Sequence, residues 1–139
     1  MIVAYIDGGC APKNPGGVGA WGIHAFKDGE GIYVAGGICG EGPQMSNNVA
    51  EYHALLRLFN YLDKLPLPED ETVEVRSDSQ LLVNQMSGEW RIKKGLYVDL
   101  ARKAYRRLKG VYTFKWIPRD ENLADKQVRV AHDRVQNQV

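Results

Sequence analysis

Hydrophobic positions along the first forty residues follow the spacing of β-strands. Residues 2–6 are apolar on both faces, which is typical of a central strand that is covered on two sides. The Asp-Gly-Gly run at residues 7–9 is expected to end it. Residues 18–26 and 31–38 predict two further strands, and Asp28-Gly29 between them is a hairpin turn signal. We expect these three strands to form an antiparallel meander.

The spacing of apolar residues becomes helical near Ser46. Leu55, Leu58 and Leu62 recur at intervals of three and four, which predicts an amphipathic helix, and Glu51 lies on its apolar stripe. The same reasoning predicts a strand, two helices, a strand and a last helix in the rest of the chain. Their expected ranges are 73–77, 80–86, 96–109, 111–117 and 121–135. The two longest of these helices have apolar stripes made by Tyr97, Ala101, Ala104, Tyr105 and Leu108 and by Ala124, Val128, Ala131 and Val135.

This order of elements predicts an α/β fold. Three antiparallel strands followed by two parallel ones would form a five-stranded mixed sheet flanked by helices. A chain of 139 residues with 44% hydrophobic residues suits one compact domain, which we assign to residues 1–139. In such a sheet, acidic residues at strand ends and in the first turns of helices can converge on one edge.

Charge is balanced overall but unevenly distributed. The 18 Lys and Arg residues nearly match the 17 Asp and Glu residues, so the net charge indicates no partner. Half of the positive charge lies between residues 91 and 115, where it forms either an anion-binding face or an ordinary solvated helix surface. The basic residues of this segment are Arg91, Lys93, Lys94, Arg102, Lys103, Arg106, Arg107, Lys109 and Lys115.

Cysteine content and hydropathy exclude several classes of protein. Cys10 and Cys39 lack metal-ligand spacing, and we interpret them as reduced packing residues. No apolar run approaches the ~20 residues that a membrane span needs. The first residues, MIVAYIDGG, are typical of a strand and carry no basic leader, so we expect no signal peptide. Together these features predict a cytoplasmic protein without membrane contact.

Four acidic residues lie at the ends of hydrophobic elements: Asp7, Glu51, Asp78 and Asp125. An acid in such a place is costly unless a cation neutralises it. Taken alone, Asp7 suits a turn, Asp78 a helix N-cap and Asp125 a solvated helix edge. Glu51 is harder to explain, because no basic residue follows it at i+3 or i+4. Four such residues in one small domain indicate a shared divalent metal and therefore a metal-dependent enzyme.

Several stretches of the chain together resemble the type 1 ribonucleases H, in the compact form without an extended basic protrusion. They are YIDGGC at 5–10, NPGG at 14–17, GAWG at 19–22, NNVAEY at 47–52, ALL at 54–56, SDSQLLVNQ at 77–85, GEW at 88–90 and WIPRDENLAD at 116–125. They follow the family's order along nearly the whole chain, and the set is far more specific than any one member. The resemblance implies a ribonuclease H-like fold and cleavage of the RNA strand of RNA/DNA hybrids, with 5′-phosphate and 3′-hydroxyl ends.

The resemblance also implies a catalytic and metal-binding set. The family's four carboxylates correspond to Asp7, Glu51, Asp78 and Asp125, which would hold two Mg²⁺ ions, with Mn²⁺ as a substitute. The residue types fit this chemistry, because Mg²⁺ prefers oxygen ligands and two metals ~3.5–4 Å apart stabilise both the attacking and the leaving oxygen of a phosphodiester. The sequence has no Cys/His cluster that would indicate zinc.

Residues that the resemblance assigns to the hybrid are mostly small and polar. Side chains of this kind can read the 2′-hydroxyl groups in the wide minor groove of a hybrid. Lys93 and its basic neighbours would hold phosphates, and Trp90 would either stack on a sugar or base or belong to the core. The expected substrate-binding residues are Gly8, Asn14, Ser46, Asn47, Asn48, Gln80, Trp90, Arg91, Lys93 and Lys94.

The chain departs from the family in the loop before the last aspartate. Many members carry a histidine there, whereas residues 115–122 contain none. We expect Arg119, Asp120 or Glu121 to take over its auxiliary role. His132, seven residues beyond Asp125, is interpreted as a surface or packing residue.

Other interpretations stay open at the level of sequence. Besides a free-standing, monomeric ribonuclease H, the chain suits a nonenzymatic module that binds hybrids, a nuclease of the same fold that cuts double-stranded RNA or DNA junctions, or a domain of a reverse transcriptase. The four acids argue against a pure binding module, because uncompensated carboxylates repel phosphates.

Overall fold

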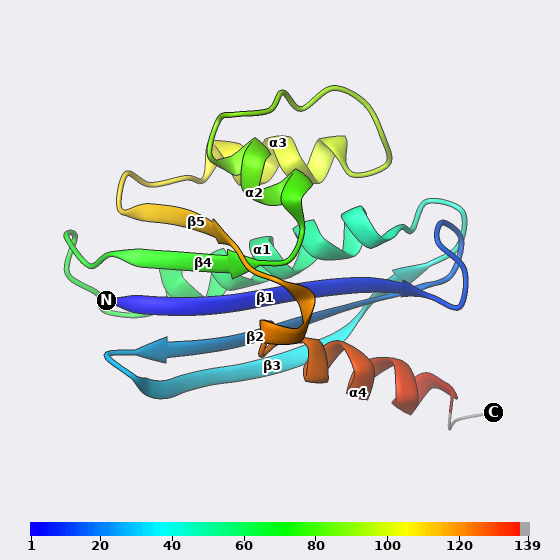
Figure 1. Cartoon of the computed structure of the whole chain (residues 1–139), viewed down its shortest axis with the longest axis horizontal. Coiled ribbons are helices and arrows are strands. Elements are labelled where there is room, and N and C mark those ends of the chain that lie inside the picture. The colour runs from blue at the N-terminus through cyan, green and yellow to red at the C-terminus, as the bar shows by residue number, and fades with distance from the viewer. Residues whose placement is uncertain (137–139) are drawn as a thin grey trace.

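The computed structural model describes residues 1–136, which form one five-stranded sheet flanked by helices (Figure 1). The strand order is β3-β2-β1-β4-β5; β1, β2 and β3 are antiparallel, and β4 pairs in parallel with β1 and β5. The α/β class and the mixed sheet expected from the sequence are confirmed. In chain order the elements are β1 (Ile2–Ala11), β2 (Val18–Lys27), β3 (Glu30–Glu41), α1 (Asn47–Asp63), β4 (Val73–Ser77), α2 (Gln80–Met86), α3 (Val98–Arg106), β5 (Tyr112–Trp116), a 3-10 turn (Arg119–Glu121) and α4 (Asp125–Gln136).

Helices cover the two faces of the sheet unequally. The long helix α1 packs against β1 and β2 on one face, and α4 packs across β2 and β3 on the other (Figure 1). Neighbouring residues of β1 show this alternation, because Gly8 faces Ala50 of α1 whereas Gly9 faces Val128 of α4. The main core lies on the α1 face, and a small cluster of Ala20, Val128 and Ala131 lies under α4. None of the helices in residues 1–136 has the length and apolar character needed to span a membrane.

Several element boundaries differ from those that the sequence predicts. β1 does not end at residues 7–9, because its residues pair with β2 in unbroken register as far as Ala11 and Val18. Asp7 therefore lies inside a strand, opposite Gly22, and is not a turn carboxylate. A strand with glycine at two successive positions still holds its ladder here, because β2 supplies a partner for every residue.

The predicted helices around α3 and α4 are also too long. α3 covers Val98–Arg106 instead of 96–109, and Tyr105, expected on its inner face, is half exposed. Only the small residues Ala101 and Ala104 are fully buried on this helix, so its contact strip is narrow. α4 begins at Asp125, not at Glu121, because the 3-10 turn and a buried asparagine redirect the chain first.

Candidate active site

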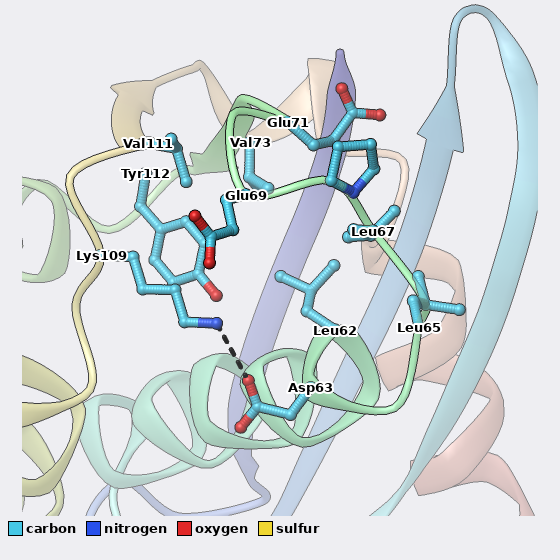
Figure 2. A pocket seen from close by; sticks show the side chains of 11 residues that line it. Leu62, Asp63, Leu65, Leu67, Glu69, Glu71, Val73, Lys109, Val111 and Tyr112 are labelled. Atoms are coloured by element: carbon cyan, nitrogen blue, oxygen red, sulfur yellow. Dashed lines mark ion pairs between the residues drawn. The ribbon is translucent and has the colours of Figure 1, made fainter.

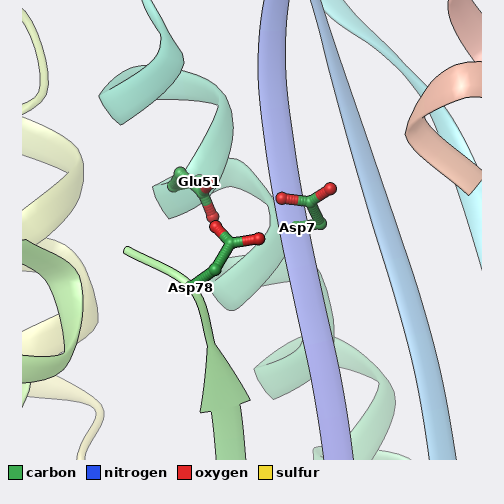
Figure 3. Close-up of side chains that lie close together, drawn as sticks. All are labelled: Asp7, Glu51 and Asp78. Carbon is green, nitrogen blue, oxygen red and sulfur yellow. The ribbon is translucent and has the colours of Figure 1, made fainter. Parts of the chain in front are cut away.

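The first two acids come together because Gly8 lets α1 approach β1 closely. A Cβ at Gly8 would lie 2.3 Å from the carbonyl carbon of Ala50 and from the nitrogen of Glu51. Only glycine is compatible with this contact between helix and strand backbones. The approach places Glu51, in the first turns of α1, beside Asp7 on the central strand (Figure 3).

Gly22 of β2 lets α4 approach the sheet closely on the opposite face. It pairs with Asp7 across the β1–β2 ladder, and a Cβ there would lie 2.6 Å from the carbonyl oxygen of Ala124. The start of α4 therefore rests directly on the strand beside Asp7. As a result Asp125, the first residue of α4, lines the same cavity as the other acids.

Asp78 is positioned by the turn after β4 and by the buried residue Asn122. Its Oδ2 accepts a hydrogen bond from Asn122 Nδ2 at 3.2 Å, and the same amide donates to the Ile6 carbonyl at 2.9 Å. Trp116 Nε1 donates to the Asp78 carbonyl at 3.1 Å. The N-cap of α2 is Ser79, whose hydroxyl accepts from Leu82, so Asp78 is not the helix cap that the sequence allowed. Its carboxylate is free to face the other acids.

The carboxylates of Asp7, Glu51 and Asp78 converge at one point. One oxygen of each lies within 4.8 Å of the others, and Figure 3 shows the three side chains turned toward one another from β1, α1 and the end of β4. They line a cavity of about 330 Å³ together with Asn47, Arg119, Asp125 and His132. Asp125 does not belong to the close group of three, and its Oδ2 accepts a hydrogen bond from Arg129 Nε at 2.9 Å.

Crowding of these acids alters their proton affinity. The pKa of Asp7 is raised to about 7, first by burial and then by the charges of Asp78 and Asp125. Burial, followed by the charges of Asp7 and Asp78, also raises the pKa of Glu51 well above its ordinary value. The backbone amide of Gly8 lowers the pKa of both groups, and the guanidinium of Arg119 lowers that of Asp7. The carboxylates are thus held close without enough positive charge to balance them.

This donor set fits a hard divalent cation. Glu51 Oε2 is buried and has no hydrogen-bond partner within residues 1–136, although a buried acceptor without a partner is costly. A cation bound by three carboxylate oxygens would satisfy this atom and remove the repulsion among the acids. Oxygen is the only donor element in the group, as Mg²⁺ and Mn²⁺ prefer.

Two of the expected substrate-binding asparagines form one network at the mouth of the cavity. Asn47 Oδ1 accepts from the Cys10 backbone amide at 2.7 Å, and Asn14 Oδ1 accepts from the Asn47 backbone amide at 2.9 Å. Ser46 caps α1 by accepting from Val49. Among the expected substrate-binding residues, Gly8 and Asn47 line the cavity itself, while half-buried Asn48 and exposed Gln80 lie in the first turns of α1 and α2.

The remaining expected contacts lie on an exposed segment, residues 88–95, which we call the basic loop. Arg91, Lys93 and Lys94 are exposed, and Trp90 is 49% exposed, so it is not a core residue. The loop is attached to the core by buried Gln85, whose Nε2 donates to the Arg91 carbonyl at 3.2 Å and to Tyr97 Oη at 3.1 Å. Gln85 Oε1 in turn accepts from Tyr52 Oη at 2.6 Å.

The structure distinguishes among the residues that were expected to replace the family's histidine. Arg119 lines the acidic cavity, whereas exposed Glu121 and Asp120 do not. His132, interpreted from the sequence as a surface or packing residue, also lines the cavity, and its Nε2 lies 2.9 Å from the Val18 carbonyl oxygen. Its separation of seven residues from Asp125 on one helix was the only sequence signal for this position. Sequence reasoning also assigned no role to Asn122, the residue that holds Asp78.

A larger cavity than the acidic one lies elsewhere in the molecule. It has a volume of about 470 Å³ and lies beyond the C-terminal end of α1, beside the start of β4 and β5 (Figure 2). Leu62, Leu65 and Leu67 contribute to its walls, and Lys109 pairs with Asp63 at 3.7 Å on its rim. Three acids, Asp63, Glu69 and Glu71, line this cavity, and none belongs to the close carboxylate group.

Comparisons with known proteins agree with this geometry. The sequence model of the reverse transcriptase-like family matches residues 7–133. A crystal structure of LC11-RNase H1, isolated from compost, in complex with an RNA/DNA hybrid is 33% identical; it covers 98% of this chain and 99% of that one, with a TM-score of 0.83. The N-terminal RNase H domain of Rv2228c from Mycobacterium tuberculosis is 28% identical over 99% of this chain and 98% of that one, with a TM-score of 0.84.

A curated relative is longer than this chain. The bifunctional protein Rv2228c of Mycobacterium tuberculosis is 37% identical over 63% of this chain. The match covers 24% of that protein, so this chain corresponds to about a quarter of the length of this relative over the matched residues. The family match extends over nearly all described residues, and the fold agrees with type 1 ribonucleases H from end to end. The chain therefore belongs to the reverse transcriptase-like family and has the fold and the acidic cluster of a type 1 ribonuclease H.

Proposed function

We propose that this protein is an endonuclease that hydrolyses the RNA strand of RNA/DNA hybrids and leaves 5′-phosphate and 3′-hydroxyl ends. One observation carries the proposal: Asp7, Glu51 and Asp78 converge within 4.8 Å in a cavity, and one of their buried oxygens lacks a partner within residues 1–136. A binding module would gain nothing from such repulsion. The likeness to LC11-RNase H1, a protein solved in complex with a hybrid, supports the choice of substrate.

The carboxylates would hold two Mg²⁺ ions, with Mn²⁺ as a substitute. When bound, the two cations would supply the charge neutralisation that phosphodiester hydrolysis needs at its attacking and leaving oxygens. Asp7 lies on the central strand β1, where it pairs with Gly22 of β2, two residues beyond the last pairing of β1 with β4 at Tyr5. Asn122 fixes Asp78 from behind, so two of the ligands reach the cavity already oriented.

The asparagine network would present hydrogen-bond donors to the minor groove of the hybrid. The side-chain oxygens (Oδ1) of Asn47 and Asn14 already accept hydrogen bonds from backbone amides of the protein. Each side chain therefore keeps its NH₂ group for substrate, and an NH₂ group suits acceptors such as 2′-hydroxyl oxygens and minor-groove base atoms. The basic loop would hold phosphates of a flanking strand, with exposed Trp90 stacking on a sugar or base.

Arg119 would take the auxiliary place that the family gives to a histidine. It lies in the wall of the acidic cavity, and its charge lowers the pKa of Asp7 and Asp78. A guanidinium is always protonated and cannot accept a proton at neutral pH. Its role would therefore be to neutralise the phosphate of substrate or product and not to shuttle a proton. Monomeric state and cytoplasmic location stay predictions.

The test is cleavage of an end-labelled RNA/DNA hybrid by the full chain with Mg²⁺, beside reactions with EDTA and with the Asp7→Asn protein. We expect RNA fragments with 3′-hydroxyl ends that disappear in both controls. Double-stranded RNA and duplex DNA of the same sequence are compared at equal concentration.

The outcomes separate the competing functions. Binding of the hybrid without cleavage by a folded protein would identify a binding module. Faster cleavage of double-stranded RNA than of the hybrid would keep the enzyme class and change the substrate. Cleavage that survives Asp7→Asn would overturn the assignment of the site.

A further inference from the structure

Asp125 stands apart from the other three acids of the site. It lines the same cavity, and its charge raises the pKa of Asp7 and Asp78, so it is within electrostatic reach of both. Its oxygens are nevertheless outside the close group formed by the other three. Its Oδ2 instead accepts from Arg129 Nε at 2.9 Å, one helical turn further along α4.

The contact between Asp125 and Arg129 has the features of a weak ion pair that can break and form again. The Arg129 side chain is 69% exposed and that of Asp125 is 25% exposed, so water screens the pair. One hydrogen bond joins them, whereas an arginine can form two parallel bonds with a carboxylate. Arg129 forms no ion pair with another acid in residues 1–136. Within residues 1–136, the Asp125 carboxylate accepts no other hydrogen bond and forms no other ion pair.

We infer that Arg129 is a positioning residue that competes with the cation for Asp125. It pairs with the carboxylate when the site is free of metal and releases it when a cation binds. The inference rests on the proposed metal-dependent nuclease site and adds a residue that sets how tightly its weaker cation is held. Binding of that cation must break one exposed ion pair, and it takes place beside an uncompensated positive charge once the pair is broken.

Binding of Mn²⁺ to the full chain without substrate tests this inference directly. Electron paramagnetic resonance of free Mn²⁺ gives the number of bound ions and their dissociation constants. In Arg129→Gln, the weaker Mn²⁺ is expected to bind about two- to fivefold tighter, as the strength of exposed ion pairs predicts. Arg129→Lys keeps the positive charge one turn from Asp125 and is expected to stay near the wild-type value.

Arg134→Gln is the matched control. It removes the same charge from the same helix, but Arg134 lies in the wall of a different cavity, beside Val34 and Gly36 of β3. We expect its Mn²⁺ affinity to match the wild type. Unchanged or weaker Mn²⁺ binding in Arg129→Gln would show that Arg129 does not compete with the cation. Equally tighter Mn²⁺ binding in Arg134→Gln would show that the effect comes from net charge alone. A wild-type protein that binds no Mn²⁺ would overturn the proposed metal site itself, which distinguishes the two failures.

Discussion

The acidic site and the basic loop serve the same proposed substrate but are built in opposite ways. The acidic site takes Asp7 from β1, Glu51 from α1, Asp78 from the turn after β4 and Asp125 from α4. The basic loop is one segment, residues 88–95, which is exposed except for Ile92 and which buried Gln85 attaches to the core. Three of the acids are pressed together by the fold, whereas the cations of the loop are surrounded by water.

The difference teaches how much a charge reveals about its role. A buried carboxylate oxygen without a partner within residues 1–136, such as Oε2 of Glu51, is costly unless a cation binds it or the group is protonated, so its position points to a ligand. An exposed lysine costs nothing and suits either a phosphate or plain solvent. The two regions should therefore respond very differently to the loss of one charge.

The largest difference is expected in catalysis. Glu51→Gln removes a metal ligand and should lower kcat/KM more than about a thousandfold, which corresponds to ~4 kcal/mol of lost transition-state stabilisation. Lys93→Gln should lower it less than about tenfold. Initial rates on an end-labelled hybrid measure both, and circular dichroism checks the fold. A Glu51→Gln protein within tenfold of wild type would contradict the functional distinction between the regions.

The second difference concerns pH and the stability of the metal-free protein. Asp7 has a pKa of about 7 in the folded protein against 3.8 for an ordinary aspartate, so the folded state binds more protons between these values. The free energy of unfolding should therefore fall as pH rises from about 4 to 7, by up to ~4 kcal/mol.

Urea denaturation in EDTA at pH 5 and pH 8 measures this effect. Asp7→Asn should weaken the pH dependence, of which the raised pKa of Glu51 keeps a part, and should make the protein more stable at pH 8 than the wild type. Lys94→Gln in the basic loop should leave the dependence unchanged. Equal pH dependence in the wild type and in Asp7→Asn would show that Asp7 does not carry the effect.

The third difference concerns the backbone that assembles the acidic site. Gly8→Ala would place a methyl group against the α1 backbone and should lower the free energy of unfolding by about 3 kcal/mol. Gly110→Ala is the control, because no atom outside its chain neighbours lies within 4 Å of the added Cβ. Denaturant unfolding at pH 5 compares them. A Gly8→Ala protein as stable as the control would mean that α1 can shift without cost.

The smallest effect is expected in the basic loop. Replacing Lys93 and Lys94 together by glutamine should weaken hybrid binding modestly and reduce the salt dependence of log Kd by about two units, one for each lost phosphate contact. Fluorescence anisotropy in Ca²⁺, which suppresses turnover, measures binding from low to high salt. Lys64→Gln, at the exposed end of α1, should leave the slope unchanged. An unchanged salt dependence of log Kd in the double variant would show that Lys93 and Lys94 contact solvent and not phosphates.

Much of the fold follows from local patterns in the sequence. The strand predicted at residues 18–26 before the Asp28-Gly29 turn and the helix predicted from the leucine spacing in α1 are confirmed by the structure. The predicted end of β1 was wrong, because the glycines at 8 and 9 are local turn signals but pair with β2 in the strand ladder. The start of α4 was also wrong, because Asn122 makes its key bonds to Ile6 and Asp78, which are remote in the chain.

The sequence by itself determined that acids occupy places where acids are costly, since burial can be estimated from hydrophobic periodicity. With the stretches that it shares with type 1 ribonucleases H, this predicted the fold, which the structure confirms, and a site of four carboxylates, three of which the structure brings together. Only the tertiary structure decided which three carboxylates meet and that Asp125, Arg119 and His132 share their cavity. These relations depend on how closely α1 and α4 approach β1, and such distances are set by contacts between residues far apart in the chain.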